Sequence, residues 1–172
     1  IKSKASFRTL KEVTVSLVHS PIEFCAELYL ISHKNQVMVQ KKLNSVMRML
    51  LSLDYDASCT DMMNVLNWLN IHNMRAWCCV RTLKRIMSHP GQTPHLWELV
   101  NMNEGALHDV RYRALKLNWR KFTRWARDSF LSQATDLYNK LGLHGQGFED
   151  YHDMRDRVKS KIIQEFGNKN LK

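Results

Sequence analysis

Residues 111–127 read Arg-Tyr-Arg-Ala-Leu-Lys-Leu-Asn-Trp-Arg-Lys-Phe-Thr-Arg-Trp-Ala-Arg. This stretch holds seven basic residues and no acidic one, so it carries +7 of the formal net charge of +10 in a chain of 172 residues. Apolar residues recur in it at steps of three and four, namely Leu115, Trp119, Phe122, Ala126 and Phe130. No Pro or Gly interrupts residues 106–141. We therefore predict one amphipathic helix that packs its aromatic side inward and presents arginines to a polyanion.

Two groups of residues are predicted to contact nucleic acid, by neutralising phosphates and by stacking one aromatic ring on a base. The main group lies on the basic stretch and comprises Arg111, Arg113, Lys116, Arg120, Lys121, Arg124, Trp125 and Arg127. A second, smaller group comprises Lys41, Lys42 and Arg48. We expect Trp119 and Phe122 to be core residues instead. The sequence leaves an alternative open for both groups, which is a solvated face on an ordinary surface helix.

The composition is that of a globular domain, with 44% hydrophobic and 24% charged residues. Only six Gly and three Pro are present, which favours long helices. No apolar run approaches the roughly 20 residues of a membrane span, so we expect no membrane partner. The four cysteines have no disulfide-framework spacing, which indicates a reducing compartment, nucleus or cytoplasm. The chain begins with Ile, and we expect it to be a piece of a longer protein.

Periodicity and capping residues predict an all-α chain of about seven helices. Ser20-Pro21 and Glu23 are expected to start one helix, Ser58 or Thr60 another, and Gly142 to follow the end of a third. The expected helical segments are 7–18, 20–33, 36–53, 58–68, 74–88, 93–99, 106–141 and 148–166, although β-branched residues leave a strand open in the first. We expect one helical domain, or two lobes that cover residues 1–104 and 105–172.

Several motifs occur along the chain in a definite order. Residues 40–50 read Gln-Lys-Lys-Leu-Asn-Ser-Val-Met-Arg-Met-Leu, and residues 66–71 read Leu-Asn-Trp-Leu-Asn-Ile. They are similar to the "L-Q-x-x-Q-N-x-A-L-R-I-I" helix and the "L-G-W-L-P" segment that follow the palm of LINE-type (non-LTR) retrotransposon reverse transcriptases. Residues 17–29, 75–87, 108–113 (His-Asp-Val-Arg-Tyr-Arg), 127–130 (Arg-Asp-Ser-Phe), 137–141 (Leu-Tyr-Asn-Lys-Leu) and 158–162 (Val-Lys-Ser-Lys-Ile) resemble further motifs of that family in the same order.

The resemblance covers nearly the whole chain and implies the helical thumb and C-terminal region of such a polymerase. A thumb grips template–primer RNA or DNA by its backbone, without reading its sequence. The chain departs from the family pattern at Val46, Tyr138 and Gly142, which stand where Ala, Trp and Pro are usual.

The sequence offers no residues for catalysis, metal binding or a cofactor. Asp54-Tyr55-Asp56 is the nearest match to the paired aspartates of a polymerase palm, but we expect a capping loop there. Cys78 and Cys79 could bind a metal only if the fold brought His72 or His89 to them. The alternative function is a captured, non-catalytic accessory subunit of a larger protein or ribonucleoprotein assembly.

Overall fold

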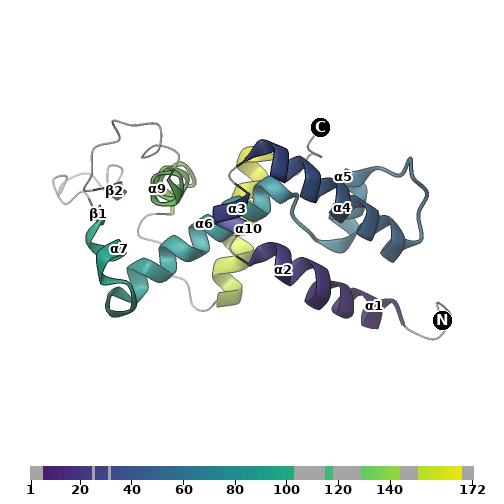
Figure 1. The fold of residues 1–172 in the computed structure, drawn as a ribbon, viewed down its shortest axis with the longest axis horizontal. Coiled ribbons are helices and arrows are strands. Elements are labelled where there is room, and N and C mark those ends of the chain that lie inside the picture. The colour runs from purple at the N-terminus through teal and green to yellow at the C-terminus, as the bar shows by residue number, and fades with distance from the viewer. Residues whose placement is uncertain are drawn as a thin grey trace. The chain divides into compact units, whose positions relative to one another are not determined.

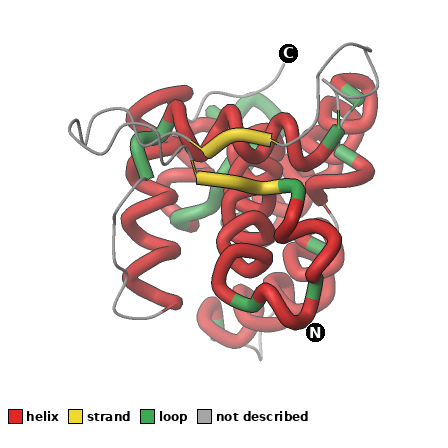
Figure 2. Tube along the Cα trace, turned by 90° about the vertical axis from the view of Figure 1, so that its left-hand side faces the viewer, coloured by secondary structure: helices red, strands yellow, loops and turns green. Residues whose placement is uncertain are grey.

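The structure is a computed structural model, and it describes residues 6–24, 26–30, 32–102, 115–117, 129–143 and 151–167. The fold is all-α in class, as predicted, with one small strand pair (Figure 1, Figure 2). In chain order the helices of the first half are α1 (Phe7–Thr14), the π-helix η1 (Val15–His19), α2 (Ser20–Glu23), α3 (Ala26–Tyr29), α4 (His33–Leu51), α5 (Cys59–Leu66) and α6 (Ile71–Ser88). They are followed by the 3₁₀ turn η2 (Pro90–Gln92), α7 (Pro94–Glu98), β1 (Val100–Met102), β2 (Leu115–Leu117), α9 (Phe130–Lys140) and α10 (Tyr151–Phe166).

The backbone groups into two compact units, which are described separately below. Unit 1 comprises residues 1–75 and 167–172, and unit 2 comprises residues 76–166, so that the division falls within α6. The predicted lobe boundary between residues 104 and 105 lies outside the described residues and stays a prediction.

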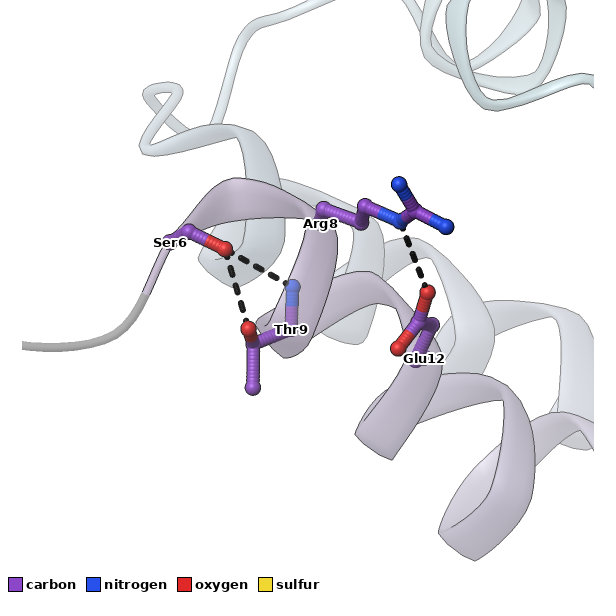
Figure 3. Close-up of polar contacts among 4 residues, drawn as sticks. All are labelled: Ser6, Arg8, Thr9 and Glu12. Atoms are coloured by element: carbon purple, nitrogen blue, oxygen red, sulfur yellow. Dashed lines mark hydrogen bonds and ion pairs between the residues drawn. The ribbon is translucent and has the colours of Figure 1, made fainter.

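The first helical path of unit 1 begins at a capped end. The hydroxyl oxygen of Ser6 accepts the Thr9 amide at 3.2 Å, and Arg8 Nε donates to Glu12 Oε1 at 3.0 Å one turn further on (Figure 3). The predicted helix start at Ser20 is wrong, because Thr14, His19 and Ser20 all keep helical backbone angles and α1 runs through η1 into α2. Pro21 lacks an N–H and crowds the preceding turn, and the wider π-turn lies directly before it.

The helix predicted over residues 20–33 is also wrong in its extent. Phe24 has an extended backbone (ψ 116°), so α2 ends at Glu23 and only a single turn, α3, follows. The continuous helical segment from α1 to α2 packs on the rest of unit 1, where Thr14 and His19 are buried. His19 Nδ1 lies 3.3 Å from Glu23 Oε1, and its ring centroid lies 5.0 Å from that of Trp68. The same segment leaves the apolar side chains of Phe7, Leu10, Val13, Leu17 and Phe24 exposed.

The helices α4 and α5 both end in the left-handed conformation that a tight helix exit requires. Ser52 (φ 55°) follows α4, where the Leu53 amide donates to the Arg48 carbonyl at 3.0 Å. Asn67 (φ 57°) follows α5, where the Trp68 amide donates to the Met63 carbonyl at 2.9 Å. Both are six-residue Schellman closures, with Ser and Asn where Gly is commonest. The predicted cap at Ser58 is confirmed, since its hydroxyl accepts the Asp61 amide at 3.3 Å.

The start of α6 shows why it begins three residues before the predicted Met74. Asn70 Oδ1 accepts the Asn73 amide at 2.7 Å, which is a helix N-cap. The Ile71 amide donates to Gln40 Oε1 on α4, also at 2.7 Å. Gln40 in turn donates to Asn44 Oδ1 at 2.8 Å. Asn44, a polar residue, is buried on the inner side of α4 together with Gln40.

Unit 2 contains the strand pair, which corrects a central prediction. Leu115–Leu117 form β2 and pair antiparallel with Val100–Met102, so the single helix predicted over residues 106–141 is wrong here. Pairing with a distant segment outweighed the local helical spacing, and the alternation Leu-Lys-Leu also suits a strand. In the described part of that range, α9 begins only at Phe130, where the Ser129 hydroxyl accepts the Ser132 amide at 3.3 Å.

The end of α9 follows the sequence-based expectation closely. Gly142 has φ +58°, as predicted for a residue after a helix C-terminus, and the Leu143 amide donates to the Tyr138 carbonyl at 3.4 Å. The Tyr138 hydroxyl donates to the Leu143 carbonyl at 2.9 Å and is buried. Lys161 of α10 donates from Nζ to the carbonyl oxygens of Leu141 and Gly142 at 3.0 and 3.1 Å. A cation thus satisfies the negative end of α9.

Each unit has its own apolar core. That of unit 1 includes Leu30, Leu43, Met47, Leu50, Met62, Met63, Leu66, Ile71 and Met74. That of unit 2 includes Trp77, Cys79, Leu83, Ile86, Leu131, Ala134, Tyr138, Leu143, Met154, Val158 and Ile162. Met154, Val158 and Ile162 recur at steps of four and form the buried side of α10, within the helix predicted over residues 148–166.

Candidate nucleic-acid interface

Most of the main predicted group lies outside the described residues. This applies to Arg111, Arg113, Arg120, Lys121, Arg124, Trp125 and Arg127, whose predicted role stays a prediction. Lys116 is the exception, since its backbone forms the middle of β2, in register with Asn101 of β1. Lys116 therefore does not belong to a helical stripe, and the helical geometry proposed for it is wrong.

The second predicted group lies on α4, which carries Lys34, Lys41, Lys42 and Arg48 and no acidic residue in its 19 positions. Lys34, Lys41 and Lys42 are exposed, on the side opposite the buried Gln36, Leu43 and Met47. None of the three lysines pairs with an acidic side chain of the described residues. This helix is therefore a cationic surface that solvent reaches.

Lys34 was not among the predicted residues. It precedes Lys41 by seven positions, and Arg48 follows Lys41 by seven, so the three lie close to one line along α4. Successive members are about 10.5 Å apart along the helix axis at 1.5 Å per residue. This seven-residue spacing is the sequence signal that could have identified Lys34. We call Lys34, Lys41 and Arg48 the α4 basic line.

Arg48 differs from the lysines because the fold holds its side chain. It is half-buried, its Nη2 lies 3.5 Å from Cys59 Sγ, and its guanidinium carbon lies 4.9 Å from the ring centroid of Tyr55. The ring and the cation form a cation–π pair. Arg48 thus joins the end of α4 to the loop of residues 52–58 and to the start of α5.

That loop contains the nearest match to paired catalytic aspartates, and its geometry is that of a turn. Asp54 and Asp56 are both exposed, and the Asp54 carbonyl accepts the Ala57 amide at 3.3 Å. Tyr55 between them is 89% exposed. The loop lies between two helices, as expected for a polar connection.

A second cationic neighbourhood in unit 1 involves His72 at the start of α6. Its pKa is lowered from the usual value by burial first, and then by the positive charges of Arg75 and His33. His33 is the first residue of α4. The first turns of α4 and α6 contain no acidic residue.

The described residues contain no cluster of three or more His, Cys, Asp or Glu side chains that could hold a metal ion. Cys78 and Cys79 are buried thiols of unit 2, and Arg81 Nη2 lies 3.7 Å from Cys78 Sγ. Over the described ranges, none of the helices has the length and apolar content needed to span a bilayer.

The sequence was compared with models of known protein families and with curated proteins, and the fold was compared with solved structures. None of these comparisons gave a match. A function for this chain therefore has to be inferred from its own residues and their positions in the fold.

Proposed function

We propose that this chain is a non-catalytic nucleic-acid-binding region that grips RNA, an RNA–DNA hybrid or DNA by its phosphate backbone. The observation that carries the proposal is α4, a 19-residue helix with four basic residues, no acidic residue and three lysines on its exposed side. Basic side chains that release counterions from phosphates give an affinity without sequence preference. The +7 stretch at residues 111–127 adds to the same electrostatic attraction.

The finer proposal is that the chain is the thumb and C-terminal region of a non-LTR retrotransposon-type reverse transcriptase. The order of the motifs along nearly the whole sequence supports it. In such a protein the chain would work in the nucleus or cytoplasm beside a catalytic palm, and it would grip the template–primer duplex while the palm performs the polymerase chemistry.

The test is fluorescence anisotropy with a labelled RNA–DNA hybrid, titrated from low to moderate salt. The variant Lys34→Gln/Lys41→Gln/Lys42→Gln removes three exposed charges of α4. A matched control, Arg8→Gln/Arg85→Gln/Arg155→Gln, removes three exposed charges from three other helices. We expect the slope of log affinity against log salt to fall by about 2 to 3 in the α4 variant, because each lost phosphate contact removes roughly 0.7–0.9.

Equal slopes for the α4 variant and the control would mean that only net charge matters, and α4 would not be the interface. A further variant, Arg113→Gln/Arg120→Gln/Arg124→Gln/Arg127→Gln, measures the contribution of the basic stretch. No salt-dependent binding by the wild-type chain would refute the nucleic-acid function itself.

A second function, an accessory subunit of a larger assembly, is favoured by a separate observation. A row of exposed apolar side chains runs along α1 and η1, namely Phe7, Leu10, Val13 and Leu17, the last being 72% exposed, and Phe24 follows α2 at 76%. Apolar residues in a continuous helical row commonly contact another protein. Sedimentation of the wild type and of Leu17→Ser/Phe24→Ser tests whether this row drives association. Association lost in the variant, with no salt-dependent binding of the hybrid, would favour the subunit.

A further inference from the structure

Tyr55 is an aromatic ring that the fold displays to solvent. At 89% it is the most exposed of the large hydrophobic side chains in the described residues. A single exposed tyrosine is common on protein surfaces and needs no explanation by itself. What distinguishes Tyr55 is that its ring also makes a cation–π contact with Arg48.

The ring is backed by a cation that is itself fixed. The guanidinium carbon of Arg48 lies 4.9 Å from the Tyr55 centroid, and the same guanidinium reaches Cys59 Sγ at 3.5 Å. The loop that carries Tyr55 is tied at both ends, by the Leu53 amide to the Arg48 carbonyl at 3.0 Å and by the Ser58 cap on α5. The ring therefore has one face against Arg48 and the other open to solvent.

The ring lies beside a positively charged helix, on a negatively charged loop. The α4 basic line, Lys34, Lys41 and Arg48, leads along the helix to the ring and ends beneath it. Asp54 and Asp56 are exposed on either side of Tyr55 along the loop. Phosphates are attracted to the helix and repelled from the loop, whereas carboxylates accept hydrogen bonds from the amino groups of bases.

We propose that Tyr55, backed by Arg48, stacks on an unpaired nucleobase of a single strand whose phosphates follow the α4 basic line. This inference rests on the proposed nucleic-acid function and gives it a ligand, a single-stranded segment of RNA or DNA. Stacking on an aromatic ring beside a row of cations is how single strands are bound without sequence preference. A base inside a duplex has both faces covered by the neighbouring base pairs, so the platform favours single strands over the interior of a duplex.

The experiment compares a labelled single-stranded 12-mer with a blunt duplex of the same sequence, by anisotropy, with Tyr55→Ala, Tyr55→Trp and the wild type. We expect Tyr55→Ala to weaken single-strand binding by about 5- to 150-fold, the usual effect of losing one stacked base. Duplex affinity and the salt slope should not change, because no charge is removed. Tyr55→Trp should keep the affinity, since it keeps a ring. Trp97→Ala, which removes another exposed aromatic ring, serves as the control and should leave binding unchanged.

The outcomes separate this inference from the function on which it rests. If the wild type binds both probes and Tyr55→Ala binds the single strand equally well, the platform is refuted while the nucleic-acid function stands. If the wild type binds neither probe, the proposed function fails and the platform fails with it. Tyr55 is so exposed that its removal should leave the melting temperature unchanged, which excludes misfolding as the cause of any loss.

Discussion

The side-chain oxygen Oε1 of Gln40 accepts a hydrogen bond from the backbone amide of Ile71 at 2.7 Å, across 31 positions of sequence. The first amides of a helix have no partner within it, and this one is buried at the start of α6. Gln40 is 1% exposed and is held in place by its own bond to Asn44. One buried side chain therefore satisfies the beginning of another helix and fixes the contact between α4 and α6 in unit 1.

Gln40→Leu should destabilise the chain by about 1–3 kcal/mol, because it leaves the buried Ile71 amide without a partner. Urea unfolding followed by tryptophan fluorescence measures the change in free energy. Gln164→Leu on the exposed side of α10 is the matched control, and it should stay within about 0.5 kcal/mol of the wild type. Equal losses in both variants would show that the bond to Ile71 contributes nothing specific.

Gly142→Ala should destabilise the chain by about 1–2 kcal/mol. The cause is the backbone, since φ is +58° there and a Cβ would meet no atom within 4 Å. Gly91 offers the same open space, and its φ is not positive, so Gly91→Ala should be neutral or slightly stabilising. Thermal unfolding of the two variants checks the contrast, and identical shifts in Tm would contradict it.

His72 should make the folded state less stable as the pH falls through about 6.5. Its pKa in the folded chain is lowered, chiefly by burial and then by Arg75 and His33, so the unfolded chain binds the proton more readily. The stability is therefore fully present above the unfolded pKa and is lost below it. Unfolding curves between pH 7.5 and 5 should show a shallower loss for His72→Gln. The same substitution at exposed His95 is the control, and an unchanged slope in His72→Gln would exclude this contribution.

Tyr138→Phe should cost about 1 kcal/mol, because it removes the buried hydroxyl that donates to the Leu143 carbonyl at 2.9 Å. Burial also raises the pKa of Tyr138, so the unfolded chain loses the proton first as the pH rises. The stability present below about pH 10 should therefore decline above it in the wild type, and less in the variant. Denaturant titrations at pH 8 and at pH 10.5 make the comparison. Exposed Tyr55→Phe should match the wild type at both values.

The local signals in the sequence predicted the helical class and several helix ends correctly. Ser58 caps α5, and Gly142 follows α9, because each needs only its own few residues to satisfy helix-end groups. The helix predicted over residues 148–166 also corresponds to α10, Tyr151–Phe166, since its apolar spacing is undisturbed. The helix start predicted at Ser20 was wrong, because Ser-Pro-x-Glu also fits within a continuing helix when a π-turn precedes the proline.

The candidate site was predicted in part. Lys41 and Lys42 are exposed on α4, as a surface contact requires, while Lys34 was overlooked. Charge and spacing identify a basic helix. They do not show which of its basic side chains is held by contacts within the protein and which remain exposed. Arg48 contacts both Tyr55 and Cys59, and no sequence pattern within α4 predicts either contact.

The sequence by itself determined that this chain is helical and basic, and where several of its helices end, because those properties depend on composition and on neighbours within one turn. Tertiary structure alone decided that Gln40 would bind the start of α6, that Leu115–Leu117 would pair with Val100–Met102, and that Arg48 would support an exposed Tyr55. Each of these contacts joins residues that are more than one helical turn apart, from seven positions for Arg48 and Tyr55 to 31 for Gln40 and Ile71. Their free energy comes from groups that meet only after the chain has folded.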